Sequence, residues 1–63
     1  MSRYLTASDK RAAIEREIKM RRRVYPRWVA DGRMTQAKAD SEIAIMEAIA
    51  EDYRAQEQKE RLL

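Results

Sequence analysis

Apolar positions in the first half of the chain recur every three or four residues, which is the spacing of one face of an α-helix. The stripe consists of Ile14, Ile18, Tyr25, Trp28 and Val29. Thr6 precedes it as a natural N-cap, and Asp9, three residues later, suits both a capping box and the positive end of a helix dipole. The pattern predicts a first helix over about residues 7–31.

Pro26 interrupts this first helical segment. Within a straight helix a proline removes one backbone hydrogen bond and clashes with the preceding turn, at a cost of about 3 kcal/mol. Tyr25 nevertheless stays in phase with Ile14 and Ile18. Two arrangements fit: a continuous helix kinked at Pro26, or a helix that restarts with Pro26 in its first turn. We expect the kinked continuous helix.

The segment around Gly32 is the clearest break in the pattern. Gly32 is the only glycine in the chain, and glycine is the residue that most readily adopts positive φ just after a helix C-terminus. Thr35 is a natural N-cap for a helix that follows. We therefore expect a tight turn over residues 32–35 that joins two antiparallel helices.

A second set of apolar positions with the same spacing follows the turn. Its members are Ala39, Ile43, Met46, Ala50 and Tyr53, with Ile45 and Ile49 beside them. At 100° per residue the widened stripe spans roughly 160°, which is more than one antiparallel neighbour covers. The pattern predicts a second helix over about residues 36–58, a frayed tail over residues 59–63, and a second helix-packing surface.

Composition narrows the fold class to all-α. The 63 residues include one Gly, one Pro and no Phe, and they are rich in good helix formers. Such a short chain buries little core, and without Cys or His it lacks the usual disulfide and metal ligands that stabilise small domains. We expect one antiparallel helical-hairpin domain over residues 1–63 that assembles as a homodimer or four-helix bundle. The expected oligomer core is Ile14, Ile18, Ile43, Ile45, Met46, Ile49 and Tyr53.

The residue types of common catalytic sites are scarce. The chain has no His, no Cys and no Gly-rich phosphate loop, and Ser2, Ser8 and Ser41 have no evident base beside them. Carboxylates are numerous, but they lie on a predicted helix, where solvated charge is the ordinary role. We therefore expect no catalytic, cofactor-binding or metal-binding residues, and a protein that is not an enzyme.

Hydropathy gives no sign of a membrane segment. No apolar run approaches the roughly 20 residues that a membrane-spanning helix needs, and the first residues have no signal-peptide pattern. We expect a cytoplasmic protein that makes no membrane contact.

The net charge of +3 is unevenly distributed. Residues 1–38 carry eleven Lys or Arg and four Asp or Glu, a net +7, whereas residues 39–63 carry three and seven, a net −4. The two halves should attract each other, and we expect Arg21 to lie opposite Glu42 and Glu47. The densest basic cluster ends the first helix. The candidate partner-binding residues there are Arg22, Arg23, Tyr25, Arg27 and Trp28.

These residues support two hypotheses. Arg, Tyr and Trp are typical of protein interfaces, which favours a homodimeric module that binds another protein. The alternative is a small basic regulator that binds RNA or DNA, with arginines on phosphates and aromatic rings stacked on bases. A plainer interpretation is that Tyr25 and Trp28 are core residues, because both lie on the apolar stripe.

Three stretches of the chain resemble sequences in a group of short, uncharacterised proteins of bacteriophages and prophages. They are RRRVYPRWV from Arg21 to Val29, GRMTQ from Gly32 to Gln36, and EIAIMEAI from Glu42 to Ile49. The resemblance covers about half of the chain and implies a phage origin, a bacterial cytoplasm and a host or phage protein as partner, but no activity. In size and expected architecture, though not in sequence, the chain also resembles the plasmid repressor-of-primer proteins, two-helix dimers that bind RNA through one helical face.

Overall fold

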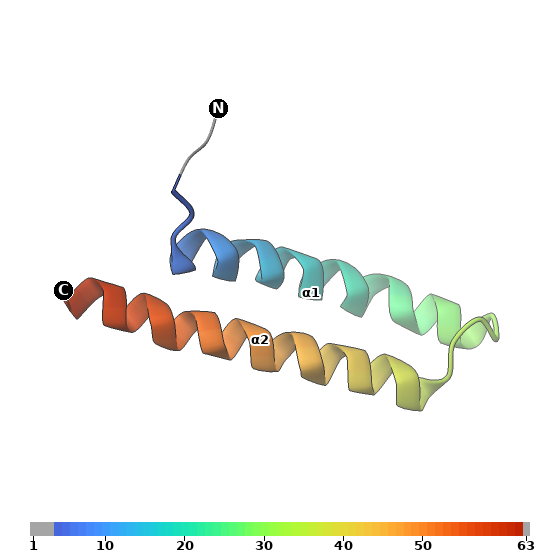
Figure 1. The fold of residues 1–63 in the computed structure, drawn as a ribbon. Coiled ribbons are helices and arrows are strands. Elements are labelled where there is room, and N and C mark those ends of the chain that lie inside the picture. Colours follow the sequence, from blue (N-terminus) through green and yellow to red (C-terminus); the bar gives the residue numbers. More distant parts are fainter. Residues whose placement is uncertain (1–3, 63) are drawn as a thin grey trace.

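The computed structural model describes residues 4–62 and forms an antiparallel hairpin of two helices (Figure 1). Helix α1 spans Ala7–Ala30 and helix α2 spans Gln36–Leu62. The two helices lie side by side, so the start of α1 and the end of α2 are at the same end of the molecule (Figure 1). The all-α class and the hairpin predicted from the sequence are confirmed.

Helix α1 begins with a reciprocal pair of hydrogen bonds. The Asp9 backbone N–H donates to Thr6 Oγ1 at 3.1 Å, and the Thr6 backbone N–H donates to Asp9 Oδ2 at 3.0 Å. This is the capping box predicted from the sequence, and it satisfies two of the backbone donors that a helix start leaves without intrahelical partners.

Helix α1 continues without interruption through Pro26. A restart of the helix at Pro26 is therefore wrong, and the continuous arrangement is confirmed. Proline donates no backbone hydrogen bond, so the carbonyl of Arg22 loses its usual partner in the helix. Pro26 is exposed, whereas Tyr25 beside it is only 5% exposed against α2. The burial of Tyr25 offsets part of the cost of the proline and holds this last turn in register.

The C-terminus of α1 forms a Schellman motif around Gly32. The Gly32 N–H donates to the Val29 carbonyl at 3.1 Å, and the Arg33 N–H donates to the Trp28 carbonyl at 2.9 Å. Gly32 has φ +75°, the left-handed conformation that glycine adopts at little cost. The prediction that Gly32 ends the first helix is confirmed.

Helix α2 begins at the predicted cap and ends later than predicted. Thr35 caps it, because the Lys38 N–H donates to Thr35 Oγ1 at 3.1 Å. The helix runs to Leu62, so the predicted end near Gln58 is wrong. Residues 59–62, predicted as a frayed tail, are helical.

The last turns of α2 are held by polar contacts that the sequence pattern does not show. Glu60 Oε1 accepts a hydrogen bond from the Ala7 N–H at 3.3 Å, which ties α2 to the first turn of α1. Arg61 Nη2 lies 3.0 Å from Glu57 Oε1. A polar segment therefore stays helical because the adjacent helix start supplies partners for it. Leu63, the end of the predicted tail, lies outside the described residues.

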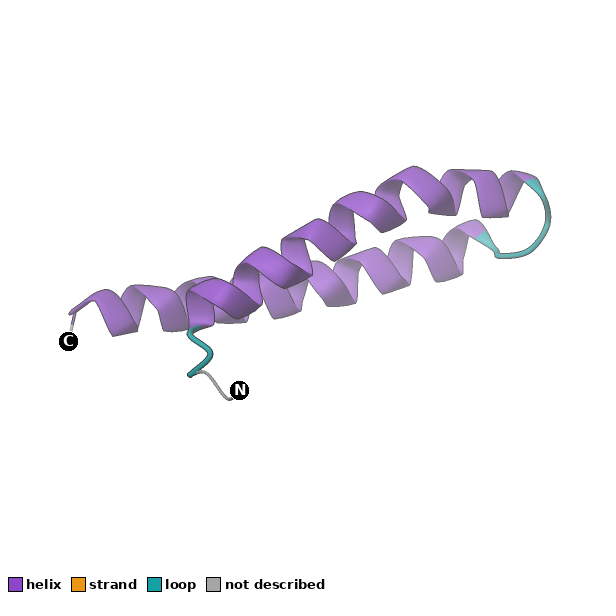
Figure 2. Ribbon diagram, turned by 90° about the horizontal axis from the view of Figure 1, so that it is seen from above, coloured by secondary structure: helices purple, strands orange, loops and turns teal. Residues whose placement is uncertain are grey.

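The core of the hairpin is a thin row of side chains between the two helices. Ile18, Met46 and Ala50 form it, with Ile14 packed against them. No large side chain in residues 4–62 is fully buried. The Cα atoms extend 47 × 27 × 13 Å, and the view from above shows a flat pair of helices with no third layer (Figure 2). A core this thin gives little hydrophobic stabilisation to a single copy.

The residues expected in an oligomer core divide into three groups in the hairpin. Ile18 and Met46 are buried between the helices of one chain. Ile14, Ile43 and Tyr53 are half-buried. Ile45 and Ile49 remain exposed, with 53% and 37% of their surface accessible.

Candidate functional site

One side of the hairpin is closed by ion pairs that cross from α1 to α2. The pairs are Arg11–Glu57, Glu15–Arg54 and Arg22–Glu47. The Arg11 Nε atom lies 2.6 Å from Glu57 Oε2, and Arg11 Nη1 also lies 2.9 Å from Glu15 Oε1. We call this side, defined by these three pairs, the ionic face. Its charges are neutralised within the chain.

The Arg11–Glu57 pair has the clearest effect on ionisation. Glu57 is only 8% exposed. Burial alone would raise the pKa of this carboxyl, but the hydrogen bond from Arg11 outweighs it and lowers the pKa of Glu57 below its ordinary value. The same hydrogen bond raises the pKa of Arg11. Both groups are therefore charged partners in a structural contact.

Two shallow hollows lie along the ionic face, on either side of the Arg22–Glu47 pair. The first has a volume of about 350 Å³ and includes Tyr25, Pro26 and Asp40 in its lining. The second, of about 310 Å³, is lined mostly by charged side chains of the ion pairs. Within residues 4–62, no three acidic side chains lie close enough together to hold a metal ion.

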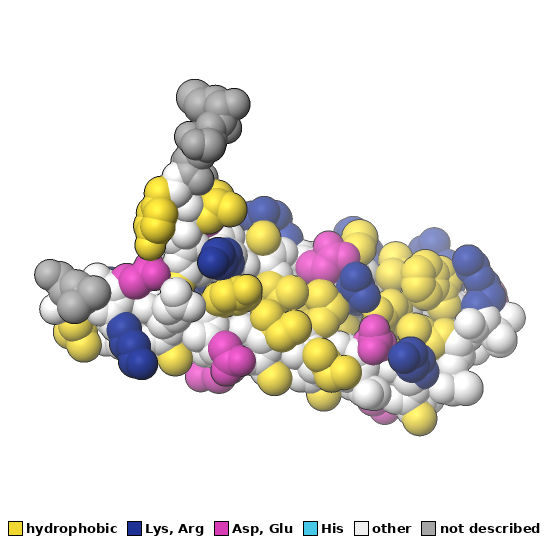
Figure 3. All heavy atoms as spheres, viewed as in Figure 1, with side chains coloured by type: hydrophobic (Ala, Val, Ile, Leu, Met, Phe, Trp, Pro, Cys, Tyr) yellow, Lys and Arg dark blue, Asp and Glu magenta, His cyan; other side chains and the backbone are white. Residues whose placement is uncertain are grey.

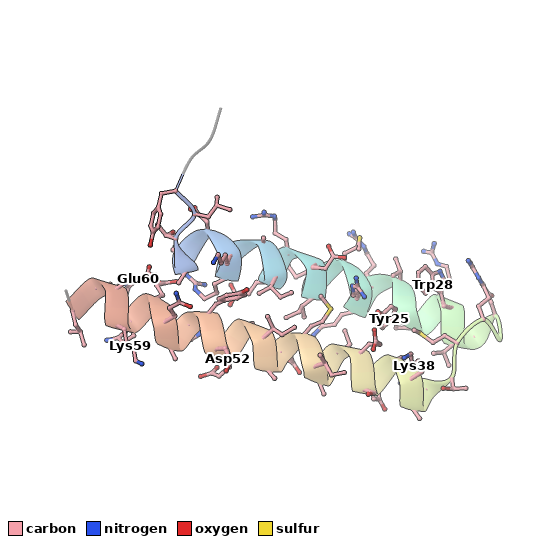
Figure 4. All side chains as sticks on the ribbon, in the orientation of Figure 1. Tyr25, Trp28, Lys38, Asp52, Lys59 and Glu60 are labelled. Carbon is pink, nitrogen blue, oxygen red and sulfur yellow. The ribbon has the colours of Figure 1, made fainter. Side chains whose placement is uncertain are left out.

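The opposite side of the hairpin carries a band of hydrophobic side chains with charged side chains interspersed, among them Lys10 over the Tyr53 ring. Figure 4 shows Lys38 and Asp52 on the visible side of α2, and Ile45 is seven residues from each, so it shares their side of the helix. Ile49 lies one turn further along. Figure 3, in the same view, shows hydrophobic side chains gathered along the line where the helices meet. We call the set Ile14, Trp28, Ile45, Ile49 and Tyr53 the apolar face.

Arg21 does not lie opposite Glu42 and Glu47 as predicted. It bonds within α1 instead, with Nη1 donating to Tyr25 Oη at 2.8 Å and Nε donating to Glu17 at 3.2 Å. The hydrogen bond to Tyr25 is the main reason that the pKa of Arg21 is raised. Arg22, rotated 100° further round the helix, reaches Glu47. The sequence pattern therefore identified the right partner helix but the wrong arginine.

The two aromatic candidates for partner binding are used inside the hairpin. Tyr25 is 5% exposed. Its ring centroid lies 5.7 Å from that of Trp28, and the guanidinium carbon of Arg33 lies 5.2 Å from the Trp28 ring centroid. The plainer interpretation, in which both rings are structural, fits these contacts. Arg22 is also engaged, through Glu47.

Arg23 and Arg27, the remaining candidates, belong to a longer row of cations. The row consists of Arg16, Lys19, Arg23 and Arg27, spaced three, four and four residues apart on the side of α1 that faces away from α2. All four are exposed, and within the described chain none of them forms an ion pair. At 1.5 Å per residue the row is about 16 Å long. Figure 3 shows Lys and Arg side chains along this upper edge of α1.

We call these four residues the basic ridge. Arg23 and Arg27 are among the partner-binding residues predicted from the sequence, whereas Arg16 and Lys19 are not. Their spacing of three and four residues was visible in the sequence, but it became informative only once the side of α1 that contacts α2 was known.

Comparison of the chain with protein-family models, with curated proteins and with solved structures finds no match in any of the three. The resemblance to short phage proteins therefore stays a prediction. Neither helix of residues 4–62 combines the length and the apolarity that crossing a membrane requires.

Proposed function

We propose that the protein is a small, non-enzymatic interaction module of a bacterial or phage system: a homodimer that binds another protein in the cytoplasm. The partner presents an acidic surface to the basic ridge of α1. The single observation that carries this proposal is the row of four exposed cations that have no ion-pair partner in the described chain.

The ridge differs from the arginines that pair with the facing helix, and this difference supports a role in binding. Single exposed charges are ordinary on a protein surface. In this hairpin, however, Arg11, Arg22 and Arg54 each pair with a carboxylate of the facing helix. The ridge faces away from the acidic helix, so no carboxylate of that helix neutralises its charge. A row of like charges on a straight helix attracts an anionic surface and steers its approach.

The structure favours a protein partner over single-stranded nucleic acid. Binding of unpaired bases commonly uses exposed aromatic rings as stacking platforms. The ridge itself has no aromatic residue. Tyr25 is buried, and Trp28 lies on the apolar face, on another side of α1. An acidic protein surface needs only the charges that the ridge supplies.

A second candidate function is binding of duplex RNA or DNA through its phosphates. The length and composition of the ridge favour it, because four cations along about 16 Å could contact a phosphate backbone. Such binding has a distinct signature. If all four cations neutralise phosphates, the logarithm of the binding constant falls against the logarithm of salt concentration with a slope of about −3.6 for duplex DNA.

The first experiment is capture of partners from nuclease-treated bacterial lysate by the tagged chain and by two charge-reversal variants. Arg23→Glu changes the centre of the ridge, and Lys59→Glu makes the same charge change at an exposed position on α2. We expect a stoichiometric protein partner with the wild type and Lys59→Glu, and its loss with Arg23→Glu. Helix content should be equal in all three by circular dichroism.

Two other results would redirect the proposal. Equal capture by Arg23→Glu and the wild type would show that the ridge is not the contact surface. Capture that disappears after nuclease treatment, together with salt-sensitive binding of a labelled duplex, would favour the nucleic-acid function.

A further inference from the structure

We propose that the apolar face binds the same face of a second copy of this chain, with α1 of each hairpin packed against α2 of the other. The product is a four-helix bundle. This inference rests on the self-association contained in the proposed function, and it adds the surface and the orientation through which the two copies meet.

The two sides of the hairpin differ in the contacts that cross between the helices and in the apolar side chains that stay exposed. On the ionic face, three cross-helix ion pairs span the contact between the helices. On the apolar face no ion pair crosses between the described residues. Lys10 Nζ lies 5.8 Å from the Tyr53 ring centroid there, and the Ala7 N–H donates to Glu60 Oε1 at the end of the hairpin. Ile45 and Ile49 stay 53% and 37% exposed on the apolar face. The band of hydrophobic side chains in Figure 3 marks this side as a contact surface.

The amount of surface fits a second copy. The chain exposes 5088 Å². A compact monomer of 7.5 kDa exposes roughly 4,250 Å², so this flat hairpin carries an excess of about 840 Å². A protein interface of standard size buries about 800 Å² on each partner. One face-to-face contact therefore removes the excess and gives the thin core a second layer.

Charge selects the orientation of the two copies. Helix α1 carries eight Lys or Arg and three Asp or Glu, a net +5, and α2 carries four and seven, a net −3. A two-fold axis perpendicular to the helices would place α1 against α1 and α2 against α2, which brings like charges together. A two-fold axis parallel to the helices places α1 against α2 of the second copy, which brings opposite charges together. All neighbouring helices are then antiparallel, as in common four-helix bundles.

This orientation also predicts which residues meet. Rotation about an axis parallel to the helices keeps each residue at its own level along the bundle. Arg22 is level with Glu47 in the hairpin, because the two form an ion pair, so Val24 is at about the level of Ile45. Val24 precedes Trp28 by one turn and lies on the same side of α1. Val24 of one copy therefore lies beside Ile45 of the second copy.

Disulfide trapping tests the orientation, because the chain has no native cysteine. Purified Val24→Cys and Ile45→Cys chains are mixed and oxidised gently. We expect a heterodisulfide between the two variants, and little homodisulfide from Ile45→Cys alone. Ala44→Cys is the matched control, because Ala44 lines a hollow on the ionic face beside Ile45 in sequence. An Ile45→Cys homodisulfide as the main product, or equal trapping by Ala44→Cys, would overturn the orientation.

Light scattering of the purified chain tests the self-association itself. The expected mass is twice the 7.5 kDa of one chain. Ile45→Asp should weaken dimerisation at least about tenfold, whereas Ala55→Asp, which introduces the same charge at an exposed position on α2, should not. A wild type that stays monomeric throughout the concentration series would overturn the inference.

The outcomes separate this inference from the proposed function. Arg23→Glu should dimerise like the wild type, because the ridge lies on the far side of α1. An intact dimer that captures no partner would contradict the proposed function alone. A monomeric chain that still captures its partner through the ridge would contradict the dimer, including the self-association in the proposed function, but not the binding of a partner through the ridge.

Discussion

Arg11 Nε donates a 2.6 Å hydrogen bond to Glu57 Oε2 and joins the first turns of α1 to the last turns of α2. The two residues are 46 positions apart in sequence. Glu57 also accepts a hydrogen bond from Arg61. The contact therefore stabilises the end of α2 and also fixes the distance between the helices. It has a direct consequence for the dependence of stability on pH.

We expect the hairpin to lose stability in acid through Glu57. Its pKa is lowered in the folded chain, so its contribution is fully present above the ordinary pKa of a glutamate and is lost as the pH falls through the lowered pKa. Glu57→Gln should lower the Tm at neutral pH and flatten the decline of Tm in acid. Thermal melts followed by circular dichroism from neutral to acid pH measure both effects.

The control for this prediction is Glu51→Gln. Glu51 pairs with Arg54 of its own helix, its one ion-pair partner among residues 4–62, and is exposed. Exposed pairs of this kind contribute little to stability. If both variants showed the same acid dependence as the wild type, the Arg11–Glu57 contact would not be a stabilising one.

Gly32→Val should destabilise the hairpin by about 1 kcal/mol or more, because a β-branched residue is strained at positive φ. The cost is assigned to the backbone conformation, since a Cβ atom at Gly32 would meet nothing within 4 Å. Gly32→Asn should cost less, because asparagine tolerates this conformation better. Urea unfolding curves compare the variants. An unchanged curve for Gly32→Val would contradict the Schellman motif at this position.

Pro26→Ala should stabilise the hairpin by about 1–3 kcal/mol. Alanine restores the backbone donor to the Arg22 carbonyl and removes the clash with the preceding turn, although it also gives the unfolded chain more freedom. Pro26 is exposed, so the change leaves no cavity in the core. Urea unfolding measures the difference, with Arg27→Ala as a control for an exposed neighbour. A less stable Pro26→Ala variant would show that the proline supports a geometry that the helix needs.

Met46→Asp should unfold the chain and dissociate the proposed dimer in one transition. Met46 is 9% exposed and packs with Ile18 and Ala50, so a carboxylate there would be buried without a partner. A thin hairpin has no separate core that could stay folded. Circular dichroism and light scattering at the same concentrations test this, with Ala55→Asp as the exposed control. A folded, monomeric Met46→Asp chain would be the contrary result.

The elements that the sequence determined depend on contacts between near neighbours. The Thr6–Asp9 capping box, the glycine at Gly32 and the Thr35 cap each involve groups within a few residues. The two apolar stripes are also local patterns, because the pitch of a helix alone relates their members. Helix starts, the turn and the hairpin could therefore be predicted before the structure was known.

The tertiary structure decided which polar groups of one helix meet the other. Glu60 reaches the Ala7 N–H across 53 positions, which explains why α2 continues past the predicted end. A rotation of 100° about α1 separates Arg21, bonded within its own helix, from Arg22, paired with Glu47. No local pattern specifies that rotation, because it follows from the packing of both helices together.

The candidate site shows the same division. Residue types in the sequence indicated a basic surface and identified Arg23 and Arg27 within it. In the packed structure Tyr25 is buried and is therefore not available to a partner. Arg16 and Lys19 are exposed in line with Arg23 and Arg27 and extend the basic surface. The reason is physical: a charge is available to a partner only where the fold provides no counter-charge, and in this protein counter-charges come both from the facing helix and from the neighbouring turn of the same helix.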